Sequence, residues 1–278
     1  MTDGMTSYVH AAWRALLYAD CFSYPLTAYE LRVWAVGVDI PIRTLRSVLR
    51  SLLTSGKVCS DGIYLWISRK NDYHVNRTIR NSASKEKYEY AKQFAKKIAH
   101  IPTIEMIAVT GSVAAGNATE HDDIDFLVVA STGTVWITRL FVILFTELFA
   151  SRRHPGDKEV ANAVCMNMFL GTDAVAFHES EQDVYTAYEL LLMEPVYDPC
   201  GVYRQMLRMN AWAKNLLPVA YQGRMLQDKR MQGNINPRRL QIPIWIERWS
   251  YHIQMWYMHH RRTSEITQSN VIRFHPHD

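Results

Sequence analysis

The feature that most constrains the fold of this chain of 278 residues is a pair of apolar segments joined through Gly-Ser. Residues 104–110 have the composition of a buried β-strand and lead directly into Gly111 and Ser112. About ten residues later, Asp123 and Asp125 open a second apolar strand. Because alternate residues of a strand project from the same face, the two carboxylates are expected to lie side by side. The pattern predicts a strand, a short helical turn and a second strand with paired acids at its start.

This pair of acids is a candidate metal site. Two carboxylates held close together repel each other unless a cation lies between them. Hard divalent ions prefer oxygen ligands, so Asp123 and Asp125 are candidate ligands of Mg²⁺ or Mn²⁺, which would also bind the phosphates of a nucleotide. Gly111 allows a close approach of the backbone, and Ser112 with its neighbouring amides is a candidate phosphate binder. Asp122 points to the opposite side of the strand and is expected to be an exposed neighbour.

These residues together resemble the motif of the nucleotidyltransferase superfamily, whose members include DNA polymerase beta, poly(A) polymerases and many small bacterial transferases. In that motif an apolar strand ends in Gly-Ser, and a second strand follows with Asp-hydrophobic-Asp-hydrophobic, as residues 123–126 do here. The resemblance implies an α/β (α+β) core with a mixed sheet. It implies metal-dependent transfer of a nucleoside monophosphate (NMP) from a nucleoside triphosphate (NTP), with release of pyrophosphate. Asp123 and Asp125 would then be catalytic and metal-binding residues, and Gly111 and Ser112 nucleotide-binding residues.

A broader resemblance extends to an uncharacterised group of prokaryotic nucleotidyltransferase-domain proteins with an N-terminal winged helix. It rests on Asn117-Ala118, on the stretch Trp136–Arg139 and on the carboxy-terminal Phe274–Asp278. Arg139 lies at the start of an apolar helix and is a further candidate for nucleotide binding through a triphosphate, with pairing to an acid as the alternative.

A third carboxylate from a later strand, which active members of the superfamily usually carry, has no obvious counterpart. The next expected strand, residues 162–170, has Cys165 or Asn167 where that acid would stand. The acids that flank this strand are alternatives that the sequence does not separate: Asp157, Glu159 and Asp173. Because such a group often helps to activate the attacking hydroxyl, its absence motivates a second hypothesis. In that hypothesis the protein is a catalytically degenerate, nucleotide-responsive DNA-binding regulator.

The N-terminal part of the chain is predicted to form a winged helix-turn-helix. Helical spacing over residues 10–19 and 28–36 is followed by a third helix from about Pro41 to Ser55, and the turn of a hairpin stands at Asp61-Gly62. The third helix presents the candidate DNA-binding residues on one face: Arg43, Arg46 and Arg50. Residues 1–75 carry a net charge of only +2, which is weak for a DNA footprint, so a scaffold role through protein contacts is the alternative.

A long basic helix is expected from Thr78 to Ala99. Its apolar stripe is predicted at Tyr88, Ala91, Ala95 and Ile98, and its solvent side at Lys85, Lys87, Lys92, Lys96 and Lys97. The expected organisation is a winged helix-turn-helix at residues 1–75, a nucleotidyltransferase domain at 76–180 and a helical C-terminal domain at 181–278.

The charge of the chain is unevenly distributed. Residues 101–200 carry a balance of −11, whereas residues 201–240 carry +7. Acids at the centre suit bound cations, and the basic C-terminal helices would suit a triphosphate or a nucleic acid. The last helix, about Ile244–Arg262, combines basic residues with aromatic ones: Trp245, Trp249, Trp256 and Tyr257. Aromatic residues at three-to-four spacing favour core packing over base stacking or a membrane-surface helix.

The four cysteines are scattered without zinc spacing or a disulfide framework, and no secretory signal is recognisable. The most apolar stretch, residues 135–150, contains Arg139 and Glu147 and is shorter than a bilayer span. We therefore expect a cytoplasmic protein without a membrane partner. The leading hypothesis is an Mg²⁺- or Mn²⁺-dependent enzyme that moves an NMP group from an NTP to an acceptor hydroxyl or phosphate.

Overall fold

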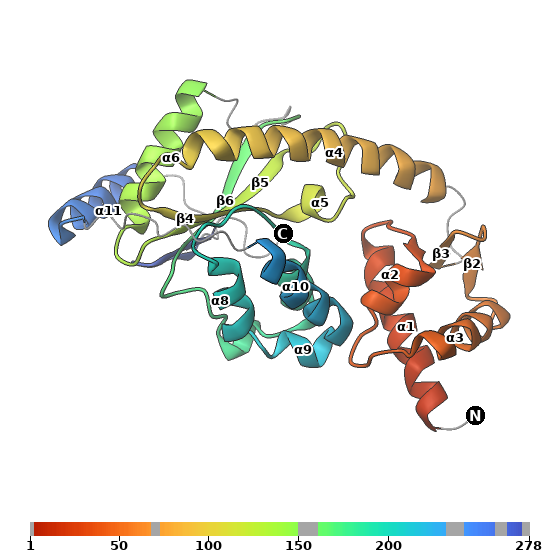
Figure 1. The fold of residues 1–278 in the computed structure, drawn as a ribbon. Helices are drawn as coiled ribbons and strands as arrows, with labels where there is room; N and C mark the ends of the chain where they lie inside the picture. The colour runs from red at the N-terminus through yellow and green to blue at the C-terminus, as the bar shows by residue number, and fades with distance from the viewer. Residues whose placement is uncertain (1–2, 68–72, 150–160, 232–241, 259–265, 274–278) are drawn as a thin grey trace. The chain divides into compact units, whose positions relative to one another are not determined.

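The computed structural model describes residues 3–67, 73–149, 161–231, 242–258 and 266–273, which form two compact units (Figure 1). The first unit comprises Met1–Ser82, His178–Leu191 and Asn210–Lys229. The second comprises Ala83–Phe177, Leu192–Met209 and Arg230–Asp278. The ranges expected from the sequence differ from these units, because residues expected to form one C-terminal helical domain are divided between both.

The first unit begins with the helices and the hairpin that the sequence predicts. In chain order its elements are α1 (Asp3–Cys21), β1 (Leu26–Thr27), α2 (Ala28–Val33), α3 (Ile42–Thr54), β2 (Val58–Ser60) and β3 (Tyr64–Ile67). The strands pair antiparallel in the order β1-β3-β2. Residues from all three helices and from the sheet share one core, which includes Leu16, Leu31, Val48 and Leu65.

Local hydrogen bonds explain where these elements begin and turn. Thr27 and Glu30 form a capping box, in which each side chain accepts a hydrogen bond from the backbone amide of the other residue at the start of α2. In the hairpin, Asp61 Oδ1 accepts hydrogen bonds from the amides of Ile63 and Tyr64. Gly62 has a φ of 95°, which favours glycine at the turn.

Two later segments complete the first unit. They contain a 3₁₀ turn (Glu179–Glu181), α7 (Val184–Leu192), α9 (Ala213–Leu216) and α10 (Pro218–Met231). Tyr188 of α7 stacks on Tyr18 of α1 with ring centroids 3.7 Å apart, and its hydroxyl donates to the Trp34 carbonyl at 3.1 Å. The Gly37 amide donates to the Leu216 carbonyl at 2.7 Å. These contacts explain why segments from beyond residue 178 belong with the N-terminus.

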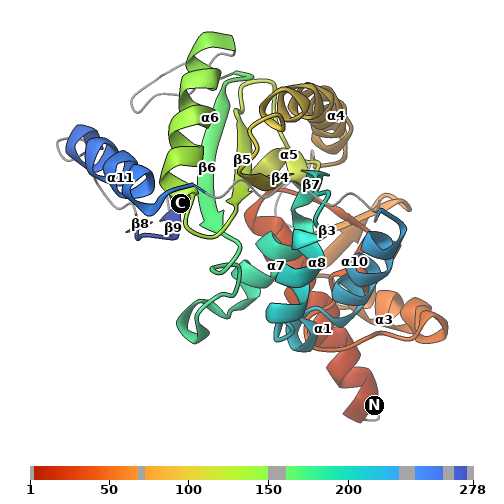
Figure 2. The ribbon, with the colours of Figure 1, turned by 60° about the vertical axis from the view of Figure 1, so that its left-hand side comes forward.

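The second unit is built on a mixed sheet with the strand order β7-β4-β5-β6-β9-β8 (Figure 2). Its strands are β4 (Ile104–Val109), β5 (Ile124–Ala130), β6 (Val164–Gly171), β7 (Glu194–Tyr197), β8 (Ile266–Thr267) and β9 (Val271–Arg273). Its helices are α4 (Tyr73–Ile98), α5 (Gly111–Ala114), α6 (Val135–Phe149), α8 (Val202–Met209) and α11 (Ile244–Met258), with the boundary between the units falling inside α4. β5 and β6 are parallel, and the other pairs are antiparallel. This mixed α/β architecture agrees with the fold class expected from the sequence.

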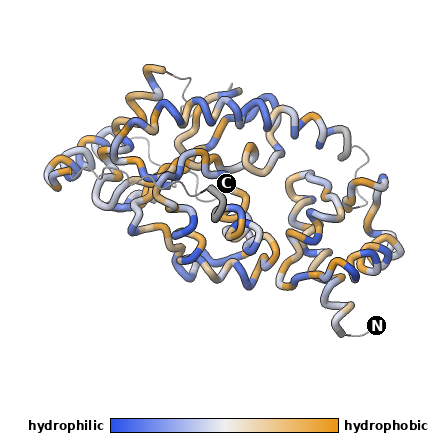
Figure 3. Tube along the Cα trace, in the orientation of Figure 1, coloured by the Kyte–Doolittle hydropathy of each residue, from blue (hydrophilic) through white to orange (hydrophobic). Residues whose placement is uncertain are grey.

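Helices α4 and α6 cover one face of this sheet. Phe94 of α4 contacts both Phe126 of β5 and Phe145 of α6. Every residue of β4 is buried, and α8 also contacts this strand. Figure 3 shows hydrophobic residues concentrated along the central strands and hydrophilic residues along much of α4. The strands that carry the motif therefore lie at the centre of the unit, where their positions are fixed by packing.

Helix α11 packs on α6 with its polar side. Its buried residues are Glu247, Ser250, Gln254 and Met258, whereas Trp245, Trp249 and Trp256 are 68%, 63% and 77% exposed. The prediction that these aromatic residues pack in the core is therefore wrong. The reason is that α6 offers polar groups to α11: Glu247 accepts hydrogen bonds from the amides of Trp136 and Ile137 at the start of α6.

Candidate functional site

The turn between β4 and α5 requires glycine at position 111. Gly111 has a φ of +63°, in the left-handed region. A Cβ atom at this position would lie only 2.6 Å from Asp125 Oδ2. The Thr110 amide also donates to the Asp125 carbonyl at 3.0 Å, which holds the turn against the start of β5. The structure thus brings together Gly111 and Asp125, two of the residues that the sequence singled out.

Asp123, Asp125 and Cys165 form a cluster beside this turn. Their candidate ligand atoms all lie within 4.8 Å of one another. Asp125 and Cys165 are register partners in the parallel pair of β5 and β6, so their side chains project from the same face of the sheet. Both aspartates are partly exposed, whereas Cys165 is 9% exposed. The cluster is therefore open to solvent on its carboxylate side.

This donor set fits a divalent cation. The two carboxylates supply oxygen ligands, and the space beside Asp125 that a Cβ at position 111 would fill is left open by glycine. Two ligands of one ion are separated by at most the sum of two metal–ligand bonds, roughly 4.4 Å for one sulfur and one oxygen. Closing a separation of up to 4.8 Å requires only small side-chain rotations.

Asp122 has a structural role in the loop that precedes β5. It is half-buried rather than exposed as expected from the sequence, and it accepts hydrogen bonds from the Thr119 hydroxyl at 2.5 Å and the Thr119 amide at 3.1 Å. Ser112 donates a further hydrogen bond. Burial tends to raise the pKa of Asp122, but these hydrogen bonds and the nearby Lys87 charge hold it below the usual value of 3.8. Ser112 therefore contacts the loop of acids directly.

Lys87 of α4 belongs to this site, and its predicted position on the solvent side of the helix is wrong. It was expected on the solvent side, yet it is 3% exposed. Its ammonium donates to the carbonyls of Glu120 and Asp122, at 3.1 and 2.7 Å, and to Asn162 Oδ1 at 2.8 Å. Burial lowers the pKa of Lys87, and the carboxylates of Asp122 and Asp123 oppose that shift.

Ser84, one turn earlier in α4, anchors the same loop. Its hydroxyl is buried and accepts a hydrogen bond from the Ala118 amide at 2.8 Å. Ser84 and Lys87 therefore tie the segment that leads into Asp123 to a long, well-packed helix. Ser84, Lys87 and Ala91 are spaced three and then four residues apart, and this helical spacing is the signal in the sequence that could have placed Ser84 and Lys87 on the buried side of α4.

The structure also bears on the candidates for a third carboxylate. Asp173 lies beyond the opposite end of β6 from Cys165, where it accepts a hydrogen bond from Asn270. Gly171 follows Cys165 by six positions along the strand, which corresponds to about 20 Å. Asp157 and Glu159 lie outside the described residues. Among the residues that the structure describes, the third position of the cluster is thus held by Cys165.

Asn167, the other candidate on β6, follows a register shift between Asp125 and Leu127 of β5. Its Oδ1 atom is buried and has no hydrogen-bond partner in the described part of the chain. A bulge of this kind changes the direction of the side chains next to it and is common beside functional sites. The irregular pairing therefore falls where the aspartates and Cys165 converge.

Arg139 belongs to the packing between α6 and α11. It is 6% exposed, and its guanidinium donates to Gln254 Oε1. Helix α6 follows the end of β5 that is remote from Asp125. Arg139 is accordingly left out of the nucleotide site proposed below. The tail Phe274–Asp278 lies outside the described residues.

The candidate DNA-binding residues lie in the first unit. Arg43, Arg46 and Arg50 are all exposed on α3, opposite the buried Leu45 and Val48. This is the division of faces predicted from the sequence.

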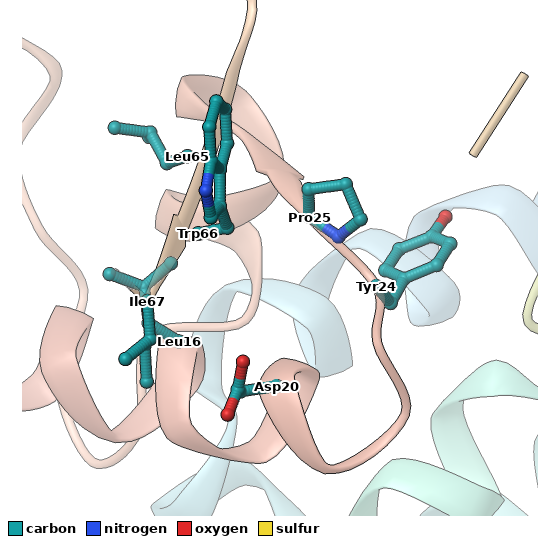
Figure 4. Close-up of a pocket in the computed structure, with 7 residues that line it drawn as sticks. All are labelled: Leu16, Asp20, Tyr24, Pro25, Leu65, Trp66 and Ile67. Carbon is teal, nitrogen blue, oxygen red and sulfur yellow. The ribbon is translucent and has the colours of Figure 1, made fainter. Parts of the chain in front are cut away.

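A pocket in the same unit is lined by Leu16, Asp20, Tyr24, Pro25, Leu65, Trp66 and Ile67 (Figure 4). Asp20 is the only charged residue among these seven, so the lining has no basic group to bind a phosphate.

Comparison with known families identifies one region of the chain. Residues 91–190 match the nucleotidyltransferase domain family. No curated protein and no solved structure matches the chain. The matched region contains Gly111, Ser112, Asp123, Asp125 and Cys165, so it includes the whole cluster. Among the described helices, none is long and apolar enough to cross a membrane.

Proposed function

We propose that the protein transfers an NMP group from an NTP to an acceptor hydroxyl or phosphate, because residues 91–190 match the nucleotidyltransferase domain family. In this reaction an acceptor oxygen attacks the α-phosphorus, the bond from that phosphorus to the bridging oxygen breaks, and pyrophosphate leaves. When the acceptor is a hydroxyl, its proton passes to the solvent. The observation that carries the proposal is the contact between Gly111 and Asp125. It places a glycine turn, of the type that approaches phosphates, directly against a paired carboxylate.

The residues of the site that surround the two aspartates have separate tasks in this proposal. Asp123 and Asp125 hold Mg²⁺ or Mn²⁺ through their partly exposed oxygens. A bound ion would supply positive charge to offset the charge that develops on the leaving pyrophosphate. Gly111 and Ser112 position the β- and γ-phosphates. Lys87 and Ser84 keep the loop before Asp123 in place, so that the carboxylates do not have to be ordered when the substrate binds.

The test is release of pyrophosphate from each of the four NTPs with Mg²⁺ or Mn²⁺, with fractions of a cell extract as the source of acceptors. The expected result is release that needs the metal ion and is lost in the double variant Asp123→Ala/Asp125→Ala. Glu120→Gln is the matched control, because Glu120 is an exposed acid of the same loop. Release that continues in the double variant would contradict the proposal.

A second candidate function is favoured by the three exposed arginines of α3 and by the lack of a third carboxylate in the described cluster. In this case the protein is a nucleotide-responsive DNA-binding regulator whose transferase domain has lost catalysis. It would bind nucleotide without releasing pyrophosphate. Its affinity for DNA would fall when Arg43, Arg46 and Arg50 are replaced together by alanine, as measured by fluorescence anisotropy. Unchanged DNA binding by the triple variant would exclude α3 as the contact surface.

A further inference from the structure

We propose that the Sγ atom of Cys165 is the third protein ligand of the divalent ion at Asp123 and Asp125. The site would then consist of carboxylate oxygens and one sulfur. This inference rests on the proposed function for the presence of a metal ion, but it concerns the identity of the ligands rather than the reaction. It gives Cys165 the position that a third carboxylate usually holds in the superfamily.

The first argument is the position of Cys165. It is the register partner of Asp125 on the adjacent parallel strand, so the two side chains leave the sheet on the same face. The sulfur and the carboxylate oxygens of Asp123 and Asp125 lie within 4.8 Å of one another. Val164 and Met166, the neighbours of Cys165 along β6, belong to the core beneath α4 and α6, which confirms that Cys165 points to the other face.

The second argument is that the residues the structure describes offer no competing ligand. Asp173 lies beyond Gly171, the last residue of β6, which is itself about 20 Å from Cys165 along the strand. Asp122 is engaged by Thr119 and Ser112. Among the described acids, cysteines and histidines, the group that can hold one ion consists of Asp123, Asp125 and Cys165.

A sulfur ligand changes which ions the site prefers. Mg²⁺ is a hard ion that favours an all-oxygen shell, whereas Co²⁺ and Zn²⁺ bind thiolate well. When the thiol binds the ion it loses its proton to the solvent, so sulfur enters the site as an anion. We therefore expect the wild-type site to favour Co²⁺ and Zn²⁺ over Mg²⁺ more strongly than a site with three carboxylates.

The test is a titration of the full-length protein with Co²⁺, followed by absorption spectroscopy. Coordination of sulfur produces a near-ultraviolet charge-transfer band from thiolate to cobalt, and carboxylates do not produce one. We expect this band in the wild type and in Cys21→Ser, which changes an exposed thiol whose hydrogen bond goes to the Leu17 carbonyl. Cys165→Ser should lose the band and at least about tenfold in affinity for Co²⁺.

A second variant keeps the test decisive if Cys165→Ser folds poorly. Cys165→Asp restores a third carboxylate, and it should bind Co²⁺ without the band while its preference shifts toward Mg²⁺. Circular dichroism and the unfolding temperature check that each variant is folded. Cobalt binding without the band in the wild type, or a band that persists in a folded Cys165 variant, overturns the inference.

The two proposals fail in distinguishable ways. Pyrophosphate release without a sulfur band supports the transferase function and shows that Cys165 is not a metal ligand. A sulfur band without pyrophosphate release supports Cys165 as a metal ligand and contradicts the proposed transfer reaction. If the wild type binds no Co²⁺, the inference is wrong, whereas the metal dependence of the reaction is decided by pyrophosphate release with Mg²⁺ or Mn²⁺.

Discussion

At the residue scale, Gly111 is the position where backbone conformation and side-chain space act together. Gly111→Ala adds a Cβ 2.6 Å from Asp125 Oδ2 and also places alanine at a φ of +63°. The backbone strain is expected to cost about 1–2 kcal/mol of folding free energy. The clash must in addition displace the Asp125 carboxylate, so metal affinity should fall at least about tenfold. Urea unfolding and a metal titration measure the two effects separately.

Gly133→Ala is the matched control for this prediction. Gly133 has a φ of +73°, but a Cβ there would meet nothing within 4 Å. It should therefore show the loss of stability without the loss of metal affinity. Equal metal affinities in the two variants would mean that Asp125 does not bind the ion through this carboxylate.

Lys87 shows which part of the site could be predicted from the residues and which part could not. The glycine turn and the paired aspartates were recognisable because each follows from strand geometry and from the known spacing of the motif. The burial of Lys87 depends on three oxygen atoms from two other segments of the chain, the loop at Glu120 and Asp122 and the side chain of Asn162. The spacing of Ser84, Lys87 and Ala91 could have placed Lys87 on the buried side of α4, but helical periodicity does not reveal which oxygen atoms a buried lysine contacts.

At the element scale, α11 has its polar side buried and its aromatic side exposed. Gln254 is 5% exposed, and it donates to the Trp136 carbonyl at 2.7 Å and accepts from Arg139. Gln254→Ala leaves buried polar groups without their partner, so we expect a loss of about 1–3 kcal/mol of folding free energy. Trp249→Ser should change it by no more than about 0.5 kcal/mol, because Trp249 is 63% exposed. Urea unfolding of both variants measures which one loses more folding free energy. A larger loss in Trp249→Ser would contradict the orientation of the helix.

This orientation was not predictable from the pattern of the helix itself. Aromatic residues at helical spacing normally face a core, because burial of their surface is favourable. Helix α11 instead buries its polar side against α6. The first amides of α6 need hydrogen-bond acceptors, and Glu247 supplies two oxygens. A sequence pattern describes one element, whereas burial depends on the surface that the element meets.

The start of α4 is joined to α2 by an ion pair whose strength depends on pH. Arg77 binds Glu30 with an N–O distance of 2.5 Å and lies 3.9 Å from the ring centre of Tyr24. Burial tends to raise the pKa of Glu30, but hydrogen bonds from Arg77 and Thr27 hold it below 4.5. Because its folded pKa is depressed, Glu30 stabilises the fold above about pH 4.5, and this contribution is lost as the pH falls through the folded value.

Arg77→Met should therefore destabilise the protein by about 2–3 kcal/mol near pH 7, somewhat less than for a fully buried pair because Glu30 is 25% exposed. The difference from the wild type should shrink in acid, once Glu30 is protonated in both proteins. Urea unfolding at several pH values measures this. Arg80→Met is the control, since Arg80 donates an exposed hydrogen bond to the Phe22 carbonyl. A difference that does not change with pH would show that the Glu30 charge is not responsible.

At the scale of the whole molecule, both units are assembled from segments that are far apart in the sequence. The first unit needs residues 178–191 and 210–229 in addition to the N-terminus, and the sheet of the second needs strands from beyond residue 190. Composition and motif spacing locate chemistry along the chain, but they do not reveal which distant segments pair. The mixed α/β core was therefore predicted correctly, whereas the expected domain limits do not match the compact units.

This discontinuity predicts that residues 76–180 do not fold by themselves, although they contain the whole motif. The fragment lacks β7, which pairs with β4, and β9, which pairs with β6. It also lacks α11, whose Glu247 caps α6. Both edges of its remaining sheet would be exposed, and such edges promote aggregation. We expect the fragment to be aggregated, or monomeric without a cooperative unfolding transition, in size-exclusion chromatography and circular dichroism.

Residues 76–278 are the matched comparison, because this longer fragment retains every described strand of the second sheet. It should unfold cooperatively and bind Co²⁺ with the same spectrum as the full chain, whereas the shorter fragment should do neither. If residues 76–180 were monomeric and unfolded cooperatively, β7 and β9 would be additions to a sheet that is already stable. The free energy that holds Asp123, Asp125 and Cys165 together would then come from β4, β5, β6 and the helices α4 and α6 alone.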